Sequence, residues 1–265
     1  MLRFHFRRMV MAGLVLCFGA TAAMGAIKTK TIEYKVEGET MEGYLAWDDA
    51  QTGNRPGVLV LHEWKGLVDF TRDRAEALAK LGYLAFAADL YGKGIRPATN
   101  DEAKVQAGKM RGDRVLLRKR VNAGLELLRK HAGVDGKRLA AVGYCFGGMS
   151  ALELARSGGD VQGIVVLHGS YDTAAPEDMK NFKGKALVIQ GSLDQASPPE
   201  KVAALEKEFS DAGVDWQLVM YGGAAHAFTN PSAGNDPSKG AAYDAKATAR
   251  SWEAMQVFFG ELFGK

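Results

Sequence analysis

Cysteine is scarce in this sequence. Cys17 and Cys145 are the only two among 265 residues, so the fold cannot depend on several disulfide bonds. Proline is also scarce, at seven residues, and no stretch rich in proline and serine marks a linker between domains. The net charge is only +3, and no basic stripe with interleaved aromatic side chains is present. We therefore expect no nucleic-acid partner.

The N-terminal apolar run is too short for a comfortable membrane span, which needs about 20 residues. It follows three arginines and ends in small residues near Ala23. This pattern is typical of a secretory signal peptide over residues 1–26, with an uncleaved anchor as the alternative. Cleavage would remove Cys17 and leave Cys145 as the one cysteine of a mature chain over 27–265. We expect an exported protein, periplasmic or secreted, without stable membrane insertion.

Predicted strands and helices alternate along the rest of the chain. An alternating segment at 31–49 favours an antiparallel hairpin, and the later apolar runs are typical of strands buried on both faces. These runs lie at 57–62, 83–90, 138–145, 163–169, 185–191 and 215–223. Helical patterns separate them at 69–82, 100–131 in two pieces, 146–156, 198–213 and 241–263. The order predicts one α/β domain over 27–265, with a doubly wound, mostly parallel sheet and helices on both faces.

A glycine-flanked cysteine stands where a predicted strand meets a predicted helix. The pattern is Gly143-x-Cys145-x-Gly147. In a nucleophile elbow the central residue occupies a tight turn, and its neighbours two positions away lack side chains because strand and helix pass closely. The helix N-terminus favours a thiolate and later an oxyanion. The alternative is a cysteine packed as a small apolar residue in an ordinary turn.

An elbow of this kind needs an acid and then a histidine after later strands. Asp194 follows the strand at 185–191, and His226 follows the strand at 215–223, so both the order and the spacing fit. Asp194 could instead cap the next helix, and His226 could be a loop histidine without a role. Asp172 is the rival acid. The remaining histidines after the N-terminal segment are poorer bases, because one ends a surface helix and two precede the required position: His131, His62 and His168.

Five motifs resemble the dienelactone hydrolase family, within the α/β-hydrolase fold. They are "LHEWKGL", "AADLYG", "VGYCFGG", "GSLDQASPP" and "HAF", and the resemblance covers roughly residues 30–263. It implies a catalytic triad of Cys145, Asp194 and His226. The cysteine elbow with a downstream aspartate and histidine is specific, since most α/β-hydrolases use serine.

The resemblance also assigns three residues around the thiol. A family glutamate that interacts with the resting thiol matches Glu63, which follows a buried strand and so belongs at the edge of the sheet where ligands bind. A solvated loop charge is the alternative reading of Glu63. The backbone N–H groups of Trp64 and Phe146 match the oxyanion donors. A carboxylate beside the thiol opposes thiolate formation, so Glu63 is expected to keep the thiol protonated until substrate displaces it.

The sequence departs from the family at the two arginines that bind the carboxylate of dienelactone. Asn230 stands at one position, and the segment "NDEAKVQ" offers only Lys104 near the other. Without them, a neutral ester or lactone is expected to be the better substrate. Three loop cations could replace the arginines and reverse that expectation: Lys65, Lys93 and Arg96.

These features predict an exported hydrolase that cleaves a small ester or lactone through a thioester on Cys145. The alternatives are a carboxylesterase or thioesterase acting on other small acyl compounds, a non-catalytic binding protein with this fold, and a thiol redox protein. A mature chain without a second cysteine argues against the last of these. No cofactor and no metal are expected. A monomer is the default expectation for the oligomeric state.

Overall fold

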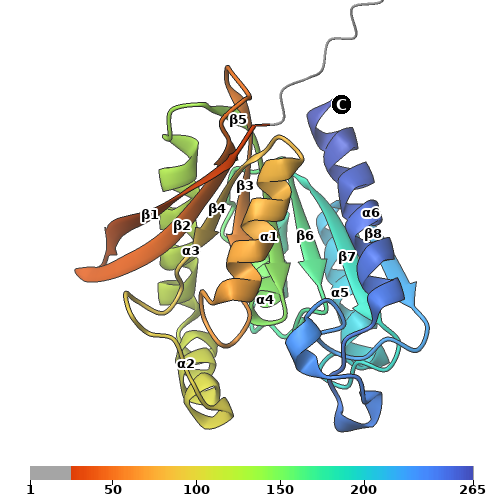
Figure 1. Cartoon of the computed structure of the whole chain (residues 1–265). Coiled ribbons are helices and arrows are strands. Elements are labelled where there is room, and N and C mark those ends of the chain that lie inside the picture. Colours follow the sequence, from red (N-terminus) through yellow and green to blue (C-terminus); the bar gives the residue numbers. More distant parts are fainter. Residues whose placement is uncertain (1–24, 265) are drawn as a thin grey trace, which may run out of the picture.

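The computed structural model describes residues 25–264. Its centre is an eight-stranded sheet in the order β1-β2-β4-β3-β5-β6-β7-β8 (Figure 1). The strands are β1 Ile27–Val36, β2 Glu39–Asp48, β3 Arg55–Leu61, β4 Leu84–Ala88, β5 Val134–Tyr144, β6 Gly163–Leu167, β7 Lys185–Gly191 and β8 Asp215–Tyr221. The predicted hairpin and each predicted apolar strand are confirmed.

The sheet is parallel from β4 to β8 and antiparallel only at one edge. β1 pairs with β2, and β2 pairs antiparallel with β4, whereas β3 runs parallel to both β4 and β5. The central strands are buried on both faces, which explains their continuous apolar sequences. The outer strand β1 is largely exposed and alternates in character.

Helices cover both faces of the sheet, as predicted. Figure 1 shows α1 and α6 on one face and α3, α4 and α5 on the other, and each group packs around its own apolar core. The helices are α1 Asp69–Lys80, α2 Asn100–Gly112, α3 Arg114–Arg129, α4 Phe146–Arg156, α5 Pro199–Ala212 and α6 Ala245–Phe263. This arrangement is the α/β-hydrolase fold expected from the sequence.

The predicted two-piece helix at 100–131 divides at a single residue. Asp113 ends α2 and caps α3, because its side chain accepts a hydrogen bond from the Leu116 N–H at 2.9 Å. Three short 3₁₀ helices in the loops were not predicted from the sequence, at Pro176–Asn181, Pro231–Ala233 and Pro237–Lys239. Such short 3₁₀ segments have no apolar periodicity to reveal them.

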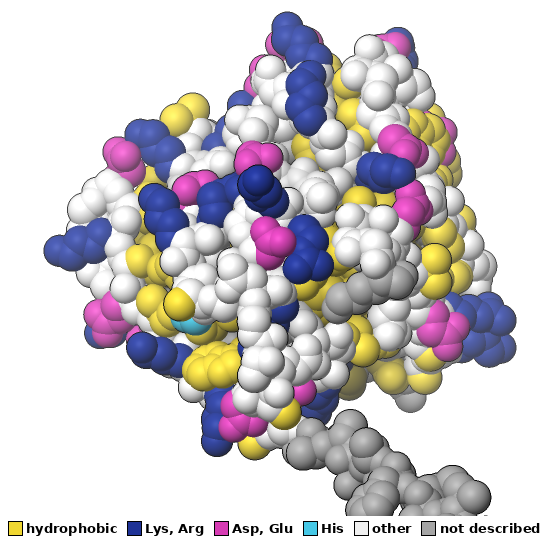
Figure 2. Space-filling view, turned by 90° about the horizontal axis from the view of Figure 1, so that it is seen from above, with side chains coloured by type: hydrophobic (Ala, Val, Ile, Leu, Met, Phe, Trp, Pro, Cys, Tyr) yellow, Lys and Arg dark blue, Asp and Glu magenta, His cyan; other side chains and the backbone are white. Residues whose placement is uncertain are grey.

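Parallel strands bring their carboxyl ends to one edge of the sheet. The loops after β3, β5, β6, β7 and β8 therefore meet there, beside α2, at the bottom of Figure 1. Figure 2 views the opposite end of the molecule, where basic and acidic side chains are interspersed. No helix within residues 25–264 is long and apolar enough to cross a bilayer. The predicted signal peptide, with Cys17, lies outside the described residues apart from its last two positions.

Candidate active site

Cys145 occupies a sharp turn between β5 and α4. Its backbone has φ 55° and ψ −111°, a left-handed conformation that is rare for a residue with a side chain. The turn is held by a hydrogen bond from the Cys145 N–H to the Leu167 carbonyl at 3.1 Å. It is a free cysteine and is 8% exposed. The turn thus presents the thiol at the N-terminus of α4, as a nucleophile elbow does.

The two glycines of the elbow are required by close backbone approaches. A Cβ on Gly143 would lie 1.9 Å from the Gly147 carbonyl oxygen, and a Cβ on Gly147 would lie 2.1 Å from the Leu61 carbonyl oxygen. Atoms cannot approach so closely, so α4 can pack against β3 and β5 only where both side chains are missing. These close approaches therefore explain why glycine occupies both flanking positions of the Gly143-x-Cys145-x-Gly147 pattern.

Asp194, His226 and Cys145 form one hydrogen-bonded chain. The His226 Nδ1 lies 2.9 Å from Asp194 Oδ2, and its Nε2 lies 3.0 Å from Cys145 Sγ. The Asp194 side chain is fully buried, whereas His226 is 15% exposed. Hence Nδ1 carries the proton donated to the carboxylate, and Nε2 faces the sulfur.

Charge on the cysteine changes the proton affinity of the histidine. Burial by itself lowers the pKa of His226, but negative charge on the Cys145 sulfur and hydrogen bonds to Asp194 and Cys145 outweigh it. The resulting pKa of His226 lies well above its usual value. Negative charge on the sulfur and the Asp194 hydrogen bond therefore favour the protonated form of His226.

Glu63 is buried beside this chain and is held by Asn230. The Asn230 Nδ2 donates to Glu63 Oε2 at 2.5 Å, and Glu63 Oε1 has no hydrogen-bond partner within the described residues. Burial raises the pKa of Glu63, while the Asn230 hydrogen bond and the nearby charge of His226 oppose that rise. Asn230, which the sequence offered only as the replacement for an arginine, thus contacts the glutamate directly.

The loop carrying Trp64 is fixed by His62 and Tyr91. Leu90 N–H donates to His62 Nε2 at 3.1 Å, so the proton of this buried ring is on Nδ1, which donates to the Glu63 carbonyl at 2.6 Å. Tyr91 donates its hydroxyl proton to the Trp64 carbonyl at 2.9 Å. The His62 ring also stacks on Phe146, with centroids 5.8 Å apart.

The backbone N–H groups of Trp64 and Phe146 remain without a protein acceptor in the described chain. Phe146 is the first residue of α4, where helical N–H groups have no partner inside the helix. These two amides, one in the loop after β3 and one at the start of α4, are the candidates for binding an oxyanion. No group of three or more His, Cys, Asp or Glu side chains between residues 25 and 264 is arranged to hold a metal ion.

The model of the dienelactone hydrolase family matches residues 41–263. The chain belongs to that family. It is accordingly a hydrolase of ester or lactone bonds. A solved structure named "m3DLH" is similar over 90% of this chain and 100% of its own, with 41% identity and a TM-score of 0.87.

Two further relatives carry informative names. A dienelactone hydrolase-like promiscuous phosphotriesterase from metagenomic libraries is 38% identical, with a TM-score of 0.85, over 90% of this chain and 100% of its own. The "Probable 2-oxo-3-(5-oxofuran-2-ylidene)propanoate lactonase" of Bradyrhizobium sp. is 29% identical over 207 residues, covering 74% of this chain and 82% of the relative.

This member of the dienelactone hydrolase family has a pocket of about 460 Å³ over its cysteine. Glu63, Trp64, Cys145 and His226 line it, together with two cations, Lys65 and Arg111. Neither cation forms an ion pair with a described residue. The further lining residues are Asn100, Ser170, Ala196, Ala227, Asn230, Ser232, Ala233 and Ala241.

Of the three cations that the sequence offered as replacements for the family arginines, only Lys65 lines this pocket. Lys93 pairs with Glu33 at 2.6 Å, and Arg96 lies 3.6 Å from Asp89. Sequence reasoning missed Arg111, which reaches the pocket from the end of α2. Arg111 lies in the last turn of α2, and nothing in its local sequence pattern marks it as a pocket residue. The pocket therefore holds two cations, Lys65 and Arg111, and the expected preference for a neutral ester or lactone stays a prediction.

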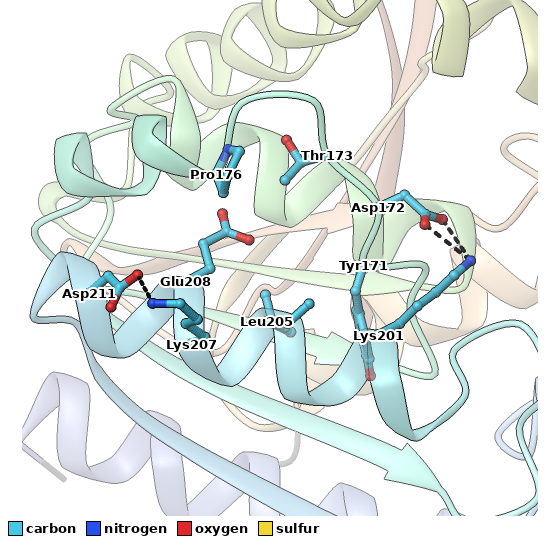
Figure 3. A pocket seen from close by; sticks show the side chains of 10 residues that line it. Tyr171, Asp172, Thr173, Pro176, Lys201, Leu205, Lys207, Glu208 and Asp211 are labelled. Carbon is cyan, nitrogen blue, oxygen red and sulfur yellow. Dashed lines mark hydrogen bonds and ion pairs between the residues drawn. The ribbon is translucent and has the colours of Figure 1, made fainter.

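The rival acid Asp172 lies elsewhere. It pairs with Lys201 at 3.1 Å beside a separate cavity of about 380 Å³, which Figure 3 shows between α5 and the loop after β6. Asp194 is not a helix cap either, because the N-cap of α5 is Pro198 and has no side-chain cap. The geometry thus brings Asp194, and not Asp172, to His226.

The other three histidines are not placed to serve Cys145. His62 is fully buried and both its ring nitrogens are occupied by backbone groups. His131 lies in the loop between α3 and β5, at the end of the sheet opposite Cys145. His168 lies near His226 but its Nε2 contacts Thr229, at 2.7 Å.

Proposed function

We propose that this member of the dienelactone hydrolase family cleaves an ester or lactone through a thioester on Cys145. The observation that carries the proposal is the unbroken chain from Asp194 Oδ2 through His226 to Cys145 Sγ, with contacts of 2.9 and 3.0 Å at a strained elbow. Nucleophile, base and orienting acid are within the hydrogen-bond reach that triad chemistry requires.

In the first half-reaction the Cys145 sulfur attacks the carbonyl carbon of an ester or lactone. The carbonyl oxygen becomes an oxyanion, which the N–H groups of Trp64 and Phe146 stabilise. His226, as the imidazolium, then gives its Nε2 proton to the leaving alkoxide as the C–O bond breaks. A thioester on Cys145 and a free hydroxyl group result; with a lactone, both remain in one molecule.

In the second half-reaction water attacks the thioester carbon. His226 accepts a proton from that water, and the same two N–H groups stabilise the second oxyanion. The C–S bond breaks, releasing the acid and regenerating the thiolate–imidazolium pair. Asp194 holds the tautomer of His226 that directs Nε2 to the sulfur in both steps.

Glu63 is proposed to restrain the thiol between turnovers. Its carboxylate is buried beside the site and its second oxygen has no partner, so a negative charge there opposes a thiolate on Cys145. Entry of a substrate would displace Glu63 from Asn230 and remove that opposition. The proposal is consistent with an exported setting, in which an unprotected thiolate is prone to oxidation.

The decisive experiment uses a panel of chromogenic esters and lactones with wild type and Cys145→Ala. Wild type is expected to hydrolyse part of the panel, and the variant to lose several orders of magnitude in kcat. Mass spectrometry of a quenched wild-type reaction should show the acyl group on Cys145. Substantial hydrolysis by Cys145→Ala would eliminate it as the nucleophile. An inactive wild type on every compound would favour a binding protein with this fold.

Phosphotriester hydrolysis is a second candidate activity. The relative that is 38% identical over its whole length has that activity in its name. A thiolate can attack phosphorus as it attacks a carbonyl carbon, and the Trp64 and Phe146 N–H groups could stabilise the phosphoryl oxygen. An aryl phosphotriester added to the same panel tests this, since release of the aryl alcohol must also depend on Cys145.

Export remains a proposal that rests on the sequence of residues 1–26. The basic start, the apolar run and the small residues at its end support it. The predicted mature chain begins at Ile27, which is also the first residue of β1. Fractionation of expressing cells tests it: the mature form should appear outside the cytoplasm with a mass that lacks the first 26 residues. A full-length protein confined to the cytoplasm would contradict the proposal.

A further inference from the structure

His168 is a buried titratable residue that the proposed reaction does not use. It follows β6 directly, is fully buried, and has a left-handed φ of 39°. Its N–H donates to the Ile189 carbonyl at 2.9 Å. A non-glycine residue in this conformation is costly, so the surrounding structure must hold it there.

The His168 side chain ties two loops together. Its Nε2 lies 2.7 Å from Thr229 Oγ1, although 61 positions separate the residues in sequence. Thr229 is 2% exposed and lies three positions after His226, with the left-handed Ala227 (φ 56°) between them. The bond therefore anchors the loop that carries His226 to the end of β6.

The His168 ring also packs against the His226 ring. The two rings meet edge to face with centroids 5.4 Å apart, and His168 meets Phe228 in the same way at 5.1 Å. The His168 Nδ1 is buried without a partner among the described residues. Since an unpaired N–H is rarer than an unpaired acceptor, the proton belongs on Nε2, which donates to Thr229.

We propose that the His168–Thr229 pair positions His226, and so sets the strength of its contact with the Cys145 sulfur. Asp194 holds Nδ1 of that ring, so a rotation of the ring about this contact would lengthen the distance from Nε2 to the sulfur. Packing against the His168 ring limits this rotation. The hydrogen bond from His168 to Thr229 restricts movement of the loop that carries His226. The inference rests on the triad proposed above, and His168 is a positioning residue rather than a catalytic one.

The neutral state of His168 suits this position. Burial lowers the pKa of His168 well below its usual value, and the charge of His226 lowers it further. The titratable groups facing His226 are thus Asp194, Cys145, Glu63 and an uncharged His168. A charged residue in place of His168 would repel the imidazolium, whereas a neutral ring contributes packing and one hydrogen bond.

The test compares Thr229→Val with Thr229→Ser. Valine keeps the shape of threonine but removes the acceptor, so kcat is expected to fall about 10–100-fold while KM changes less than about twofold. Serine keeps the hydroxyl and should retain most of the activity. Thr71→Val is the matched control, because Thr71 is also a buried threonine but its hydroxyl has no partner in the described structure. It should leave kcat unchanged.

A second measurement separates positioning from loss of stability. The rate at which iodoacetamide alkylates Cys145 is followed against pH, with thermal unfolding recorded for each variant. In Thr229→Val the half-maximal rate should move to higher pH, because a displaced imidazolium stabilises the thiolate less. His168→Phe should behave alike, and His168→Gln, whose amide can replace Nε2–H, should recover part of the loss.

An unchanged alkylation profile and kcat in Thr229→Val would overturn the inference. So would an equal loss in Thr229→Ser, since that variant keeps the hydrogen bond. Failure of the underlying proposal looks different: Cys145→Ala would then remain active, whatever the Thr229 variants do.

Discussion

Replacing Gly147 by alanine is expected to damage catalysis while leaving the protein folded. The added Cβ would lie 2.1 Å from the Leu61 carbonyl oxygen and 2.8 Å from that of His62, both backbone atoms at the end of β3. Real Cβ contacts are not closer than 3.0 Å, so α4 and the end of β3 must separate by about 0.9 Å. Because the clashing atoms of Leu61 and His62 belong to the backbone, rotation of a side chain cannot relieve the contact.

The two sides of that contact carry the two proposed oxyanion donors. Phe146 precedes Gly147 at the start of α4, and Trp64 lies two positions after His62. A separation of 0.9 Å would lengthen one donor distance from about 2.9 Å to nearly 4 Å, beyond a useful hydrogen bond. Loss of one such donor lowers kcat about 10²–10³-fold, or roughly 3–4 kcal/mol in the transition state. Overpacking costs about 1–3 kcal/mol of stability, which a typical domain tolerates.

The assay measures kcat on a chromogenic ester together with thermal unfolding. Gly108→Ala in α2 is the matched control, because a Cβ there meets nothing within 4 Å. Alanine should stabilise that helix by about 0.5–1 kcal/mol and leave kcat unchanged. A folded Gly147→Ala variant with kcat within about threefold of wild type would refute the reasoning, since the close approach would then not support the oxyanion site.

Three other outcomes can be checked with the same purified protein. Asp194→Asn should lower kcat by up to about 10⁴-fold through the wrong imidazole tautomer, whereas Asp172→Asn should be harmless; the reverse result would reassign the acid. Replacing Lys65 or Arg111 by glutamine should lower kcat/KM for a carboxylate-bearing ester by up to about tenfold at low salt. A neutral analogue should be unaffected, and an equal loss on both substrates would refute a charge effect. Burial lowers the pKa of His62 from 6.5 to about 4, so the folded state excludes a proton that the unfolded state binds. Stability is then complete above pH 6.5 and falls by about 3 kcal/mol as the pH drops towards 4. Urea unfolding across this range should show a flatter profile for His62→Gln; an equally steep profile would exclude His62 as the cause.

The strands, most helices and the elbow could be predicted from short stretches of sequence. Continuous apolar runs mark strands buried on both faces, and β3 to β7 all have them. The loop turns between Pro231 and Lys239 could not be found in this way, because they are built from caps by Asn230 and Asp236 rather than from apolar periodicity. The order of Cys145, Asp194 and His226 was equally readable, since parallel strands bring successive loops to one edge.

By itself, then, the sequence determined the alternating α/β order, the need for glycine on both sides of Cys145, and the candidates for acid and base. These properties depend on local periodicity or on chain order. Only the tertiary structure decided that Asp172 faces Lys201, that Asn230 holds Glu63, that Arg111 reaches the pocket and that the His168 ring packs against the His226 ring. Each of these contacts joins residues far apart in the chain, and their meeting depends on how loops from different strands pack against one another.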